Sequence, residues 1–443
     1  MEKIGMVSLG CPRNLVDSEV MLGSLKKEGY IISDDVGDGV DVFIINTCSF
    51  VRTAREESIE TILEVAELKK EGKIRYLVVA GCLGQARGAK LLKDLPEIDS
   101  VIGAGDFCRI GEIVKKLLKD KRSCEVSKKL RYLYDDRSPR LLLTAAHYAY
   151  VKISEGCDNR CSYCIISRLR GRFRSRSIDS VMEEVKNLSA SGRLKEIDLI
   201  GQDTTLFGID SCGRSVFGEL LKKLAALDNS VEWIRVLYTH PAHYTEEFIS
   251  VVKGEPKICK YLDLPIQHIS DRILKKMNRH VTSRQLKELI INIRKNIPSV
   301  ALRTSVIVGF PGETEKDFKE LLAFLKDTRF ERLGAFIYSK EEGSKASKFS
   351  GQIPEKLKNE RFDAVMKLQQ AVSAGTNRSF LGRSMKVLID EKTEDNKYFG
   401  RTEFDAPEVD GGVYVTGKGI KVGNFCKVKI TDTLEYDLVG EAQ

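Results

Sequence analysis

Residues 148–164 have the sequence YAYVKISEGCDNRCSYC, an apolar run followed at once by a loop with three cysteines. The run 148–153 has the length and composition of a buried strand. Cys157, Cys161 and Cys164 are spaced C-x3-C-x2-C, so a tight loop can turn three thiols toward one centre. Three thiolates leave one iron of a four-iron cluster open, whereas electron-transfer clusters usually have four cysteine ligands. We therefore expect an iron–sulfur cluster whose open iron binds a small molecule.

The same loop could instead form a structural zinc site, or its three thiols could be unrelated. Zinc sites usually pair two C-x-x-C units or add histidines, and none of the five histidines is adjacent to the loop. The candidate ligand of an open iron is the amino-acid end of S-adenosylmethionine.

From residue 148 to about residue 337 the chain alternates apolar runs with amphipathic segments. The predicted strands are 148–153, 196–200, 233–237, 261–264, 302–308 and 332–337. The predicted helices are 178–189, 215–227, 245–252, 283–295 and 314–326. Six βα units predict a partial, open TIM-type barrel, because closure needs eight. The three cysteines follow its first strand, at the end of the barrel where such folds place their chemistry.

The N-terminal part of the chain shows the same alternation, which is typical of a parallel sheet covered by helices. Its predicted strands are 4–9, 42–45, 76–79 and 100–102, and its predicted helices include 18–27 and 53–70. Cys11, Cys48 and Cys82 each follow one of the first three strands. Because the carboxyl ends of parallel strands line one edge, these thiols are expected to converge and to hold a second cluster. The alternative is three buried core cysteines.

The remaining five cysteines share no such spacing, and we interpret them as ordinary thiols: Cys108, Cys124, Cys212, Cys259 and Cys426. The charge-rich interval 119–140 is expected to be a linker. The segments 385–389, 413–416 and 425–430 predict a small all-β domain. We therefore expect three domains, at residues 1–135, 140–370 and 375–443.

Length and composition set further bounds. The 443-residue chain is too long for one core. It has no run of about eighteen apolar residues, and its N-terminus lacks a secretory signal pattern, so we expect a cytoplasmic protein. In a reducing compartment disulfides are rare, so cysteine clusters indicate metal binding or chemistry. The net charge of +8 permits contact with RNA or the ribosome without requiring it.

Glycine-rich and polar turns follow several barrel strands and are expected to bind the cofactor. Glycines let a backbone approach a ligand closely, and a following helix N-terminus offers N–H groups to a carboxylate. A plain turn capped by Thr314 is the alternative at 309–314. The expected cofactor-binding residues are Tyr163, Gly201, Gln202, Asp203, Arg303, Gly309 and Gly312. His268 is interpreted as structural. The arginines Arg170, Arg172, Arg174 and Arg176 form either a solvated face or a contact to substrate or cofactor.

The three-cysteine loop, the set of Cys11, Cys48 and Cys82, and the C-terminal β segment together resemble the radical S-adenosylmethionine methylthiotransferases. The resemblance covers essentially the whole chain, in the order methylthiotransferase domain, radical domain, TRAM domain. Within the family, the chain is most similar to the RimO branch. The matching stretches are 8–19, 152–157, 338–343 and 405–411. One departure is Ser167, where relatives commonly carry proline, which leaves the stiffness of the loop open.

The resemblance implies a reaction. RimO-like enzymes methylthiolate the β-carbon of one aspartate in small-subunit ribosomal protein twelve. It implies two four-iron four-sulfur clusters, with S-adenosylmethionine as the source of a 5′-deoxyadenosyl radical and of the methyl group. The cluster on Cys157, Cys161 and Cys164 would generate the radical, and the N-terminal cluster would offer sulfur. An electron donor such as flavodoxin or ferredoxin is a further expected partner.

The sequence leaves two alternative functions open. A MiaB-like enzyme would modify an adenosine in transfer RNA, and a plain iron–sulfur electron carrier would catalyse nothing. Residues 375–443 carry 10 Lys and Arg against 12 Asp and Glu, a net of −2. Because an RNA binder should present a basic domain, this favours a basic protein substrate. We expect Asp405, Glu408 and Asp410 to contact that substrate.

Overall fold

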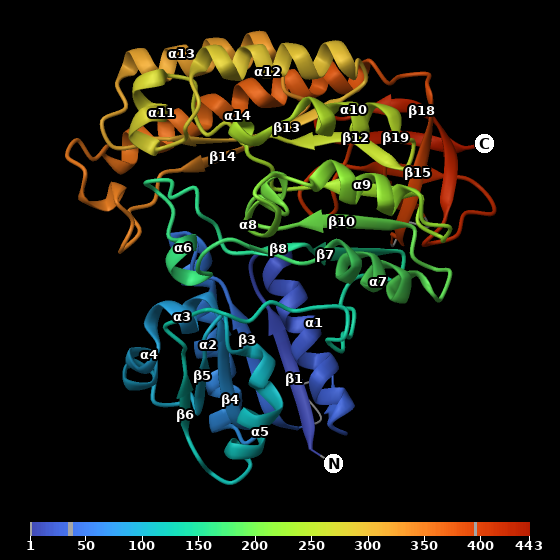
Figure 1. Ribbon diagram of the computed structural model, residues 1–443. Helices are drawn as coiled ribbons and strands as arrows, with labels where there is room; N and C mark the ends of the chain where they lie inside the picture. The colour runs from blue at the N-terminus through green and yellow to red at the C-terminus, as the bar shows by residue number, and fades with distance from the viewer. Residues whose placement is uncertain (1, 34–38, 394–396) are drawn as a thin grey trace.

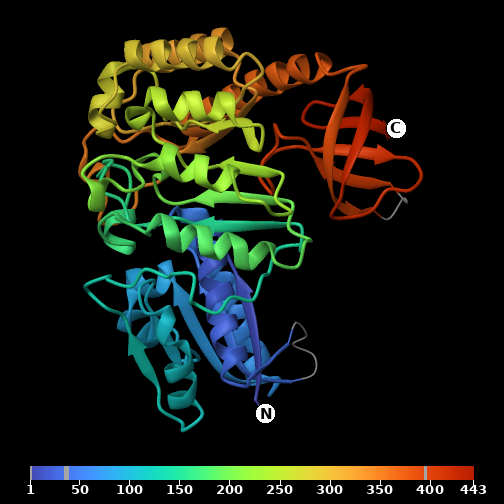
Figure 2. The ribbon, with the colours of Figure 1, turned by 45° about the vertical axis from the view of Figure 1, so that its right-hand side comes forward.

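The computed structural model describes residues 2–33, 39–393 and 397–443. Its strands form two six-stranded parallel sheets, a closed five-stranded barrel and a two-stranded ribbon. The N-terminal sheet lies below the central sheet, and the C-terminal barrel lies beside the central sheet (Figures 1 and 2). The expected class, an α/β chain with a small all-β C-terminal domain, is confirmed. None of the described helices is long and apolar enough to cross a membrane.

The N-terminal sheet has the strand order β2-β1-β3-β4-β5-β6, with every neighbouring pair parallel. Its strands are β1 (Lys3–Ser8), β2 (Ile31–Ile32), β3 (Val40–Thr47), β4 (Ile74–Gly81), β5 (Ser100–Ile102) and β6 (Ser123–Glu125). Its helices are α1 (Pro12–Lys27), α2 (Arg52–Lys70), α3 (Cys82–Arg87), α4 (Ala89–Asp94), α5 (Ile110–Leu117) and the short η1 (Phe107–Arg109). The interval predicted to be a linker thus contains β6, which pairs with the edge of this sheet.

Helices cover both faces of this sheet, and β3 shows why. Along a strand, successive side chains point to opposite faces. Val42 and Ile44 therefore pack in one core with α1 and α5, while Phe43 and Ile45 pack in a second core with α2. A strand buried on both faces is apolar throughout, which is what made β3 and β4 recognisable.

The central sheet has the order β14-β13-β12-β11-β10-β7 and is open, as the six predicted units required. Its strands are β7 (Tyr148–Lys152), β10 (Glu196–Ile200), β11 (Trp233–Val236), β12 (Ile258–Asp263), β13 (Ala301–Val308) and β14 (Arg332–Ile337). The long helices are α7 (Ile178–Ser189), α9 (Phe217–Ala225), α10 (Glu246–Gly254), α12 (Ser283–Asn296), α13 (Glu315–Thr328) and α14 (Glu355–Arg378). The shorter elements are β8 (Ser154–Glu155), β9 (Arg174–Ser175), α6 (Ile166–Leu169), α8 (Ile209–Cys212), α11 (Asp271–Met277), η2 (Thr204–Leu206), η3 (Pro241–His243) and η4 (Ala346–Lys348). The sequence did not predict α11 and α14.

The C-terminal strands close into a barrel in the order β15-β16-β17-β19-β18. They are β15 (Ser384–Lys392), β16 (Tyr398–Arg401), β17 (Val413–Thr416), β18 (Phe425–Thr433) and β19 (Leu438–Ala442). The strands β16 and β19 were not predicted. The chain's one tryptophan, Trp233 of β11, packs edge-on against Phe425 of β18 at 4.7 Å between ring centroids.

Residues 401–410, the last residue of β16 and the segment after it, pack against the central sheet, and we call them the plug. Arg401 donates to Glu196 Oε2 at 2.6 Å, and Arg235 donates to Glu403 O at 2.8 Å. Arg332 pairs with Asp405, and Tyr261 donates to Asp410 Oδ2 at 2.6 Å. The plug therefore packs against four strands of a sheet that has too few strands to close into a barrel.

The plug corrects one expectation. The side chains of Asp405 and Asp410 are buried and paired inside the chain, so they do not form a docking surface. Burial raises the pKa of Asp410, against the opposing effect of Arg303. Glu408 is exposed and accepts a hydrogen bond from Tyr148 at 3.0 Å. Acidic residues in this segment stabilise the fold, and their count says little about the partner.

Replacing Asp405 by Ala should destabilise the protein by about 3 kcal/mol, because it leaves the buried guanidinium of Arg332 without its carboxylate. Urea unfolding followed by the fluorescence of Trp233 measures this loss. Glu408→Ala is the matched control and should change stability by less than about 1 kcal/mol, since its carboxylate is exposed. Equal effects of the two substitutions would contradict the structural role of Asp405.

Candidate active site

A cavity of about 390 Å³ lies at the carboxyl end of the central sheet. Segments from all three parts of the chain line it: the cysteine loop, the turns after β1 and β3, and the plug. The N-terminal sheet contributes Pro12, Arg13, Phe50 and Val51, and the plug contributes Pro407 and Val409. The carboxyl edges of the two parallel sheets therefore meet at one cavity.

The cysteine loop lines this cavity with Cys157, Cys161 and Cys164. Its backbone is fixed from outside by Ser162, whose N–H donates to Met277 O at 2.9 Å and whose hydroxyl donates to Lys276 O at 2.7 Å. Arg279 Nη1 lies 3.6 Å from Cys161 Sγ, and the backbone nitrogen of Ile166 lies 3.4 Å from Cys164 Sγ. The loop thus presents its sulfurs in a rigid frame with donors directed at two of them.

Burial sets the protonation of these thiols. It raises the pKa of Cys157 to about 11 and that of Cys164 to about 12. Metal ligation requires the thiolate form, so iron binding would release protons here.

Cys11, Cys48 and Cys82 lie side by side at the carboxyl edge of the N-terminal sheet. They follow β1, β3 and β4, which are neighbours in the sheet order. Gly10, at φ +89°, packs so closely on Cys48 that an added Cβ would lie 2.9 Å from its Sγ. Burial, together with Cys82, raises the pKa of Cys48 to about 12. The pKa of Cys11 is lowered despite burial, because Arg13 and Arg170 favour its thiolate.

The spacing of the sulfurs distinguishes a cluster from a single ion. Two thiolates on one zinc, at about 2.3 Å each, are at most about 4.6 Å apart. Among the described residues, the one group of three ligand atoms all within 4.8 Å of one another is Asp203, His240 and His243. Neither cysteine set is that compact. Three cysteine thiols at each set are donors of the kind that iron–sulfur clusters take.

Buried ion pairs join the two cysteine sites. Lys152 of β7 pairs with Asp17 of α1 and, at 2.7 Å, with Glu155. Arg170 pairs with Asp17, and its Nη2 lies 3.6 Å from Cys82 Sγ. Of the four predicted arginines, Arg170 therefore contacts the N-terminal site. Breaking a buried pair leaves an uncompensated charge, so this network holds the two sheets in a fixed relation.

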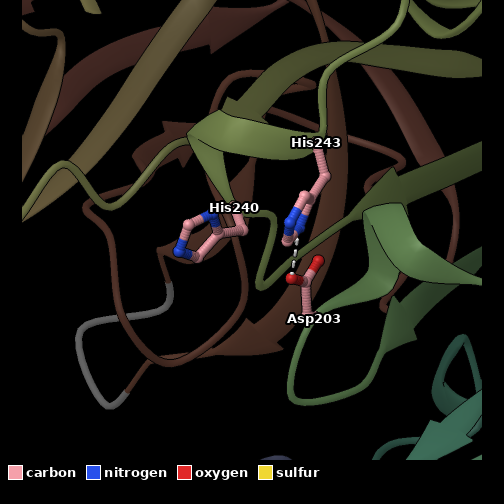
Figure 3. A group of neighbouring side chains, drawn as sticks. All are labelled: Asp203, His240 and His243. Carbon is pink, nitrogen blue, oxygen red and sulfur yellow. Dashed lines mark hydrogen bonds and ion pairs between the residues drawn. The ribbon is translucent and has the colours of Figure 1, made fainter. Parts of the chain in front are cut away.

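The ligand atoms of Asp203, His240 and His243 all lie within 4.8 Å of one another, and Figure 3 shows the three side chains. Asp203 accepts from His243 Nδ1 at 2.8 Å and from Asn159 of the loop at 2.7 Å. Burial raises the pKa of Asp203, but His243 and the hydrogen bond from Thr205 act in the opposite direction, and the net shift is downward. Because the carboxylate is already shared among these donors, we interpret the group as a support for the loop.

His240 presents one N–H to the cavity. Burial, with Arg279 nearby, lowers its pKa to about 2, so the ring is neutral. Its Nδ1 accepts from the backbone of Ala242 at 3.2 Å, which places the proton on Nε2. Nε2 has no hydrogen-bond partner among the described residues, and His240 lines the cavity. This donor is free for a ligand.

The residues expected to bind the cofactor divide into two sets. Tyr163, Gln202 and Arg303 line the cavity. Gly201, Asp203, Gly309 and Gly312 are not among the described residues that line it.

The turns at Gly309, Gly312 and His268 have contacts within the fold. An added Cβ on Gly309 would meet Lys358 of α14, and Gly312 donates to Gly351 O at 2.7 Å, so these two glycines serve packing. His268 is buried, and its Nδ1 accepts a hydrogen bond from the N–H of Ser270 at 3.0 Å, which is consistent with a structural role.

Among the cavity residues that the sequence analysis did not predict are Arg13, Tyr238, His240 and Arg279. Only Arg13 had a signal, its position two residues after Cys11. The others come from turns after β11 and α11, where single polar residues are common.

Three family models match the chain. They are described as the Radical SAM superfamily, over residues 151–325, an uncharacterized protein family, UPF0004, over residues 3–103, and the TRAM domain, over residues 381–442. Curated relatives match along the full length. A ribosomal protein uS12 methylthiotransferase RimO from Heliobacterium modesticaldum is 47% identical over 99% of this chain and 95% of the relative. RimO from Geobacter sulfurreducens is 46% identical over 99% of this chain and 98% of its own.

Solved structures of the same architecture are more distant. The radical S-adenosylmethionine methyltransferase TsrM from Kitasatospora setae aligns with a TM-score of 0.54 at 15% identity, covering 76% of this chain and 73% of its own. At this identity the likeness concerns the fold alone.

Proposed function

Because this chain belongs to the RimO family of radical S-adenosylmethionine methylthiotransferases, we propose that it methylthiolates the β-carbon of an aspartate in ribosomal protein uS12. The observation that carries the proposal is one cavity that the loop of Cys157, Cys161 and Cys164 lines together with Pro12, Arg13, Phe50 and Val51, the residues that follow Cys11 and Cys48. Replacing a C–H bond by C–S needs a hydrogen abstracted and a sulfur delivered at one carbon. A cavity between two such sites lets one bound side chain meet both.

S-adenosylmethionine and an iron–sulfur cluster are the cofactors of the family. That this chain holds two clusters is part of our proposal: Cys157, Cys161 and Cys164 would hold one, and Cys11, Cys48 and Cys82 the other. When bound, the first cluster supplies the electron that cleaves S-adenosylmethionine. An electron donor of the flavodoxin or ferredoxin type would be the partner that reduces this cluster again.

The chain's own residues position the cysteine sulfurs and line the cavity. Arg279 and Arg170 direct N–H donors at Cys161 and Cys82, and such hydrogen bonds tune the sulfurs of a cluster. The plug supplies an apolar floor in Pro407 and Val409. His240 Nε2 and Gln202 offer polar contacts for S-adenosylmethionine.

The substrate assignment predicts a change of mass in one protein. In cells that lack this gene, the target peptide of uS12 should lose a methylthio group, and restoring the gene should return it. Mass spectrometry of ribosomal proteins measures the change. A transfer RNA digest from the same cells serves as the internal control and should keep its methylthioadenosine. Loss of that nucleoside beside an unchanged uS12 peptide would favour the MiaB-like alternative.

The electron-carrier alternative makes a different prediction. A carrier would not produce 5′-deoxyadenosine when reduced in the presence of S-adenosylmethionine. We expect that product, since three cysteines at each site leave an iron open.

A further inference from the structure

The cavity holds three arginines, Arg13, Arg279 and Arg303, and they differ in their partners. Arg303 already pairs with Asp263 at 3.1 Å and Asp410 at 3.5 Å. Arg279 is buried, donates to the backbone oxygen of Pro265 at 2.5 Å and directs Nη1 at Cys161. In the described part of the chain, Arg13 has no carboxylate within ion-pair distance, and it is only half-buried.

Arg13 also lies between the two cysteine sites. It follows Cys11 by two residues, and it lines the cavity together with Cys157, Cys161 and Cys164. Its guanidinium carbon lies 4.3 Å from the centre of the Tyr238 ring, and Nη1 donates to Gly201 O at 3.0 Å. A guanidinium carries five N–H donors, so its contacts to Gly201 and Cys11 leave others for a ligand.

Apart from its contact with Cys11, this cation has no anionic partner among the described side chains, so it is available to bind an anionic group of a ligand in the cavity. Stacking on Tyr238 and the bond to Gly201 fix the plane of the guanidinium before any ligand arrives. A planar guanidinium binds a carboxylate through two parallel hydrogen bonds, which fixes orientation as well as position.

We propose that Arg13 is the specificity residue that binds the carboxylate of the substrate aspartate. The inference rests on the proposed function. The carbon that reacts is bonded directly to the carboxyl carbon, so a group that holds the carboxylate also holds the β-carbon between the two cysteine sites. Asparagine and alanine at the substrate position would lack the charge that this contact requires.

A double-mutant cycle tests the pairing. The enzyme is native or Arg13→Gln, and the substrate is purified uS12 with its target aspartate intact or replaced by asparagine. Binding to reconstituted enzyme with S-adenosylmethionine is measured as Kd. For the native enzyme, the asparagine substrate should bind about tenfold or more weakly, as expected for a hydrogen-bonded charge. For Arg13→Gln, the same change of substrate should cost less than about twofold.

Two controls separate this role from a structural one. Arg284→Gln removes one exposed positive charge on α12 and should keep the full discrimination. Arg13→Lys keeps the charge but not the planar guanidinium, so its preference for the aspartate over the asparagine substrate should lie between those of the native enzyme and Arg13→Gln. The same variant replaces Arg13→Gln in the test if Arg13→Gln fails to bind iron. An asparagine penalty equal in native enzyme and both Arg13 variants overturns the inference. Native enzyme that leaves uS12 unmodified overturns the proposed function instead.

Discussion

Replacing Cys157, Cys161 and Cys164 together by Ala should abolish formation of 5′-deoxyadenosine and leave about half of the iron. Two four-iron clusters correspond to about eight irons per chain, and this substitution removes the ligands of one. The remaining iron would be bound by Cys11, Cys48 and Cys82, which follow strands of a separate sheet. Iron analysis after anaerobic reconstitution, with chromatography of the nucleoside product, measures both effects.

A matched control is available in the same chain. Cys108, Cys124 and Cys212 are all exposed and lie outside both sets. Their joint replacement by Ala removes the same number of thiols and should leave iron and product unchanged. Unchanged iron in the Cys157, Cys161 and Cys164 variant, or its complete loss from folded protein, would show that the division into two clusters is wrong.

Replacing Cys11, Cys48 and Cys82 by Ala should have a different outcome: no methylthio product, but continued reductive cleavage of S-adenosylmethionine. In our proposal, radical formation requires only the loop after β7, whereas sulfur delivery requires the cysteines at the edge of the N-terminal sheet. Product on uS12 is followed by mass spectrometry and 5′-deoxyadenosine by chromatography, in the same reaction.

The buried ion pairs between the two sheets link Cys82 to the cysteine loop, so this variant needs a control. Arg170 contacts both Cys82 and Asp17, so removing the thiols could disturb the cysteine loop through Arg170. Cys82→Ala alone tests that route, and we expect it to retain 5′-deoxyadenosine formation. Loss of 5′-deoxyadenosine from a folded, iron-loaded triple variant would contradict independent function of the two sites.

The sequence predicted the central strands of the two parallel sheets, and the cysteines that follow them, because both depend on short-range pattern. A strand buried on both faces is visibly apolar, and thiols after successive parallel strands must share an edge. The helix α14 was missed because many of its buried residues are polar, among them Lys358, Arg361, Gln369 and Asn377. Their burial depends on partners elsewhere in the chain, so no apolar period marks the helix.

The misassigned acidic residues show the same limit. Charged side chains are usually exposed unless they are paired. The partner of Asp405 is Arg332, and that of Asp410 is Arg303, both on strands of the central sheet. Arg13 was missed for the same reason, because its environment is created by Tyr238 and Gly201, far along the chain.

The plug changes how a truncated form of this protein should be interpreted. A chain that ends before β15 would lack the C-terminal barrel. It would also lack Pro407 and Val409, which line the cavity. The buried Arg332 would lose its carboxylate partner Asp405, and Arg235 would lose its hydrogen bond to Glu403 O. Inactivity of such a truncated protein would therefore be explained by an incomplete cavity, and it would not show that the C-terminal barrel recognises the substrate. A chimera that keeps residues 401–410 and exchanges only the outer loops of the barrel would report recognition itself.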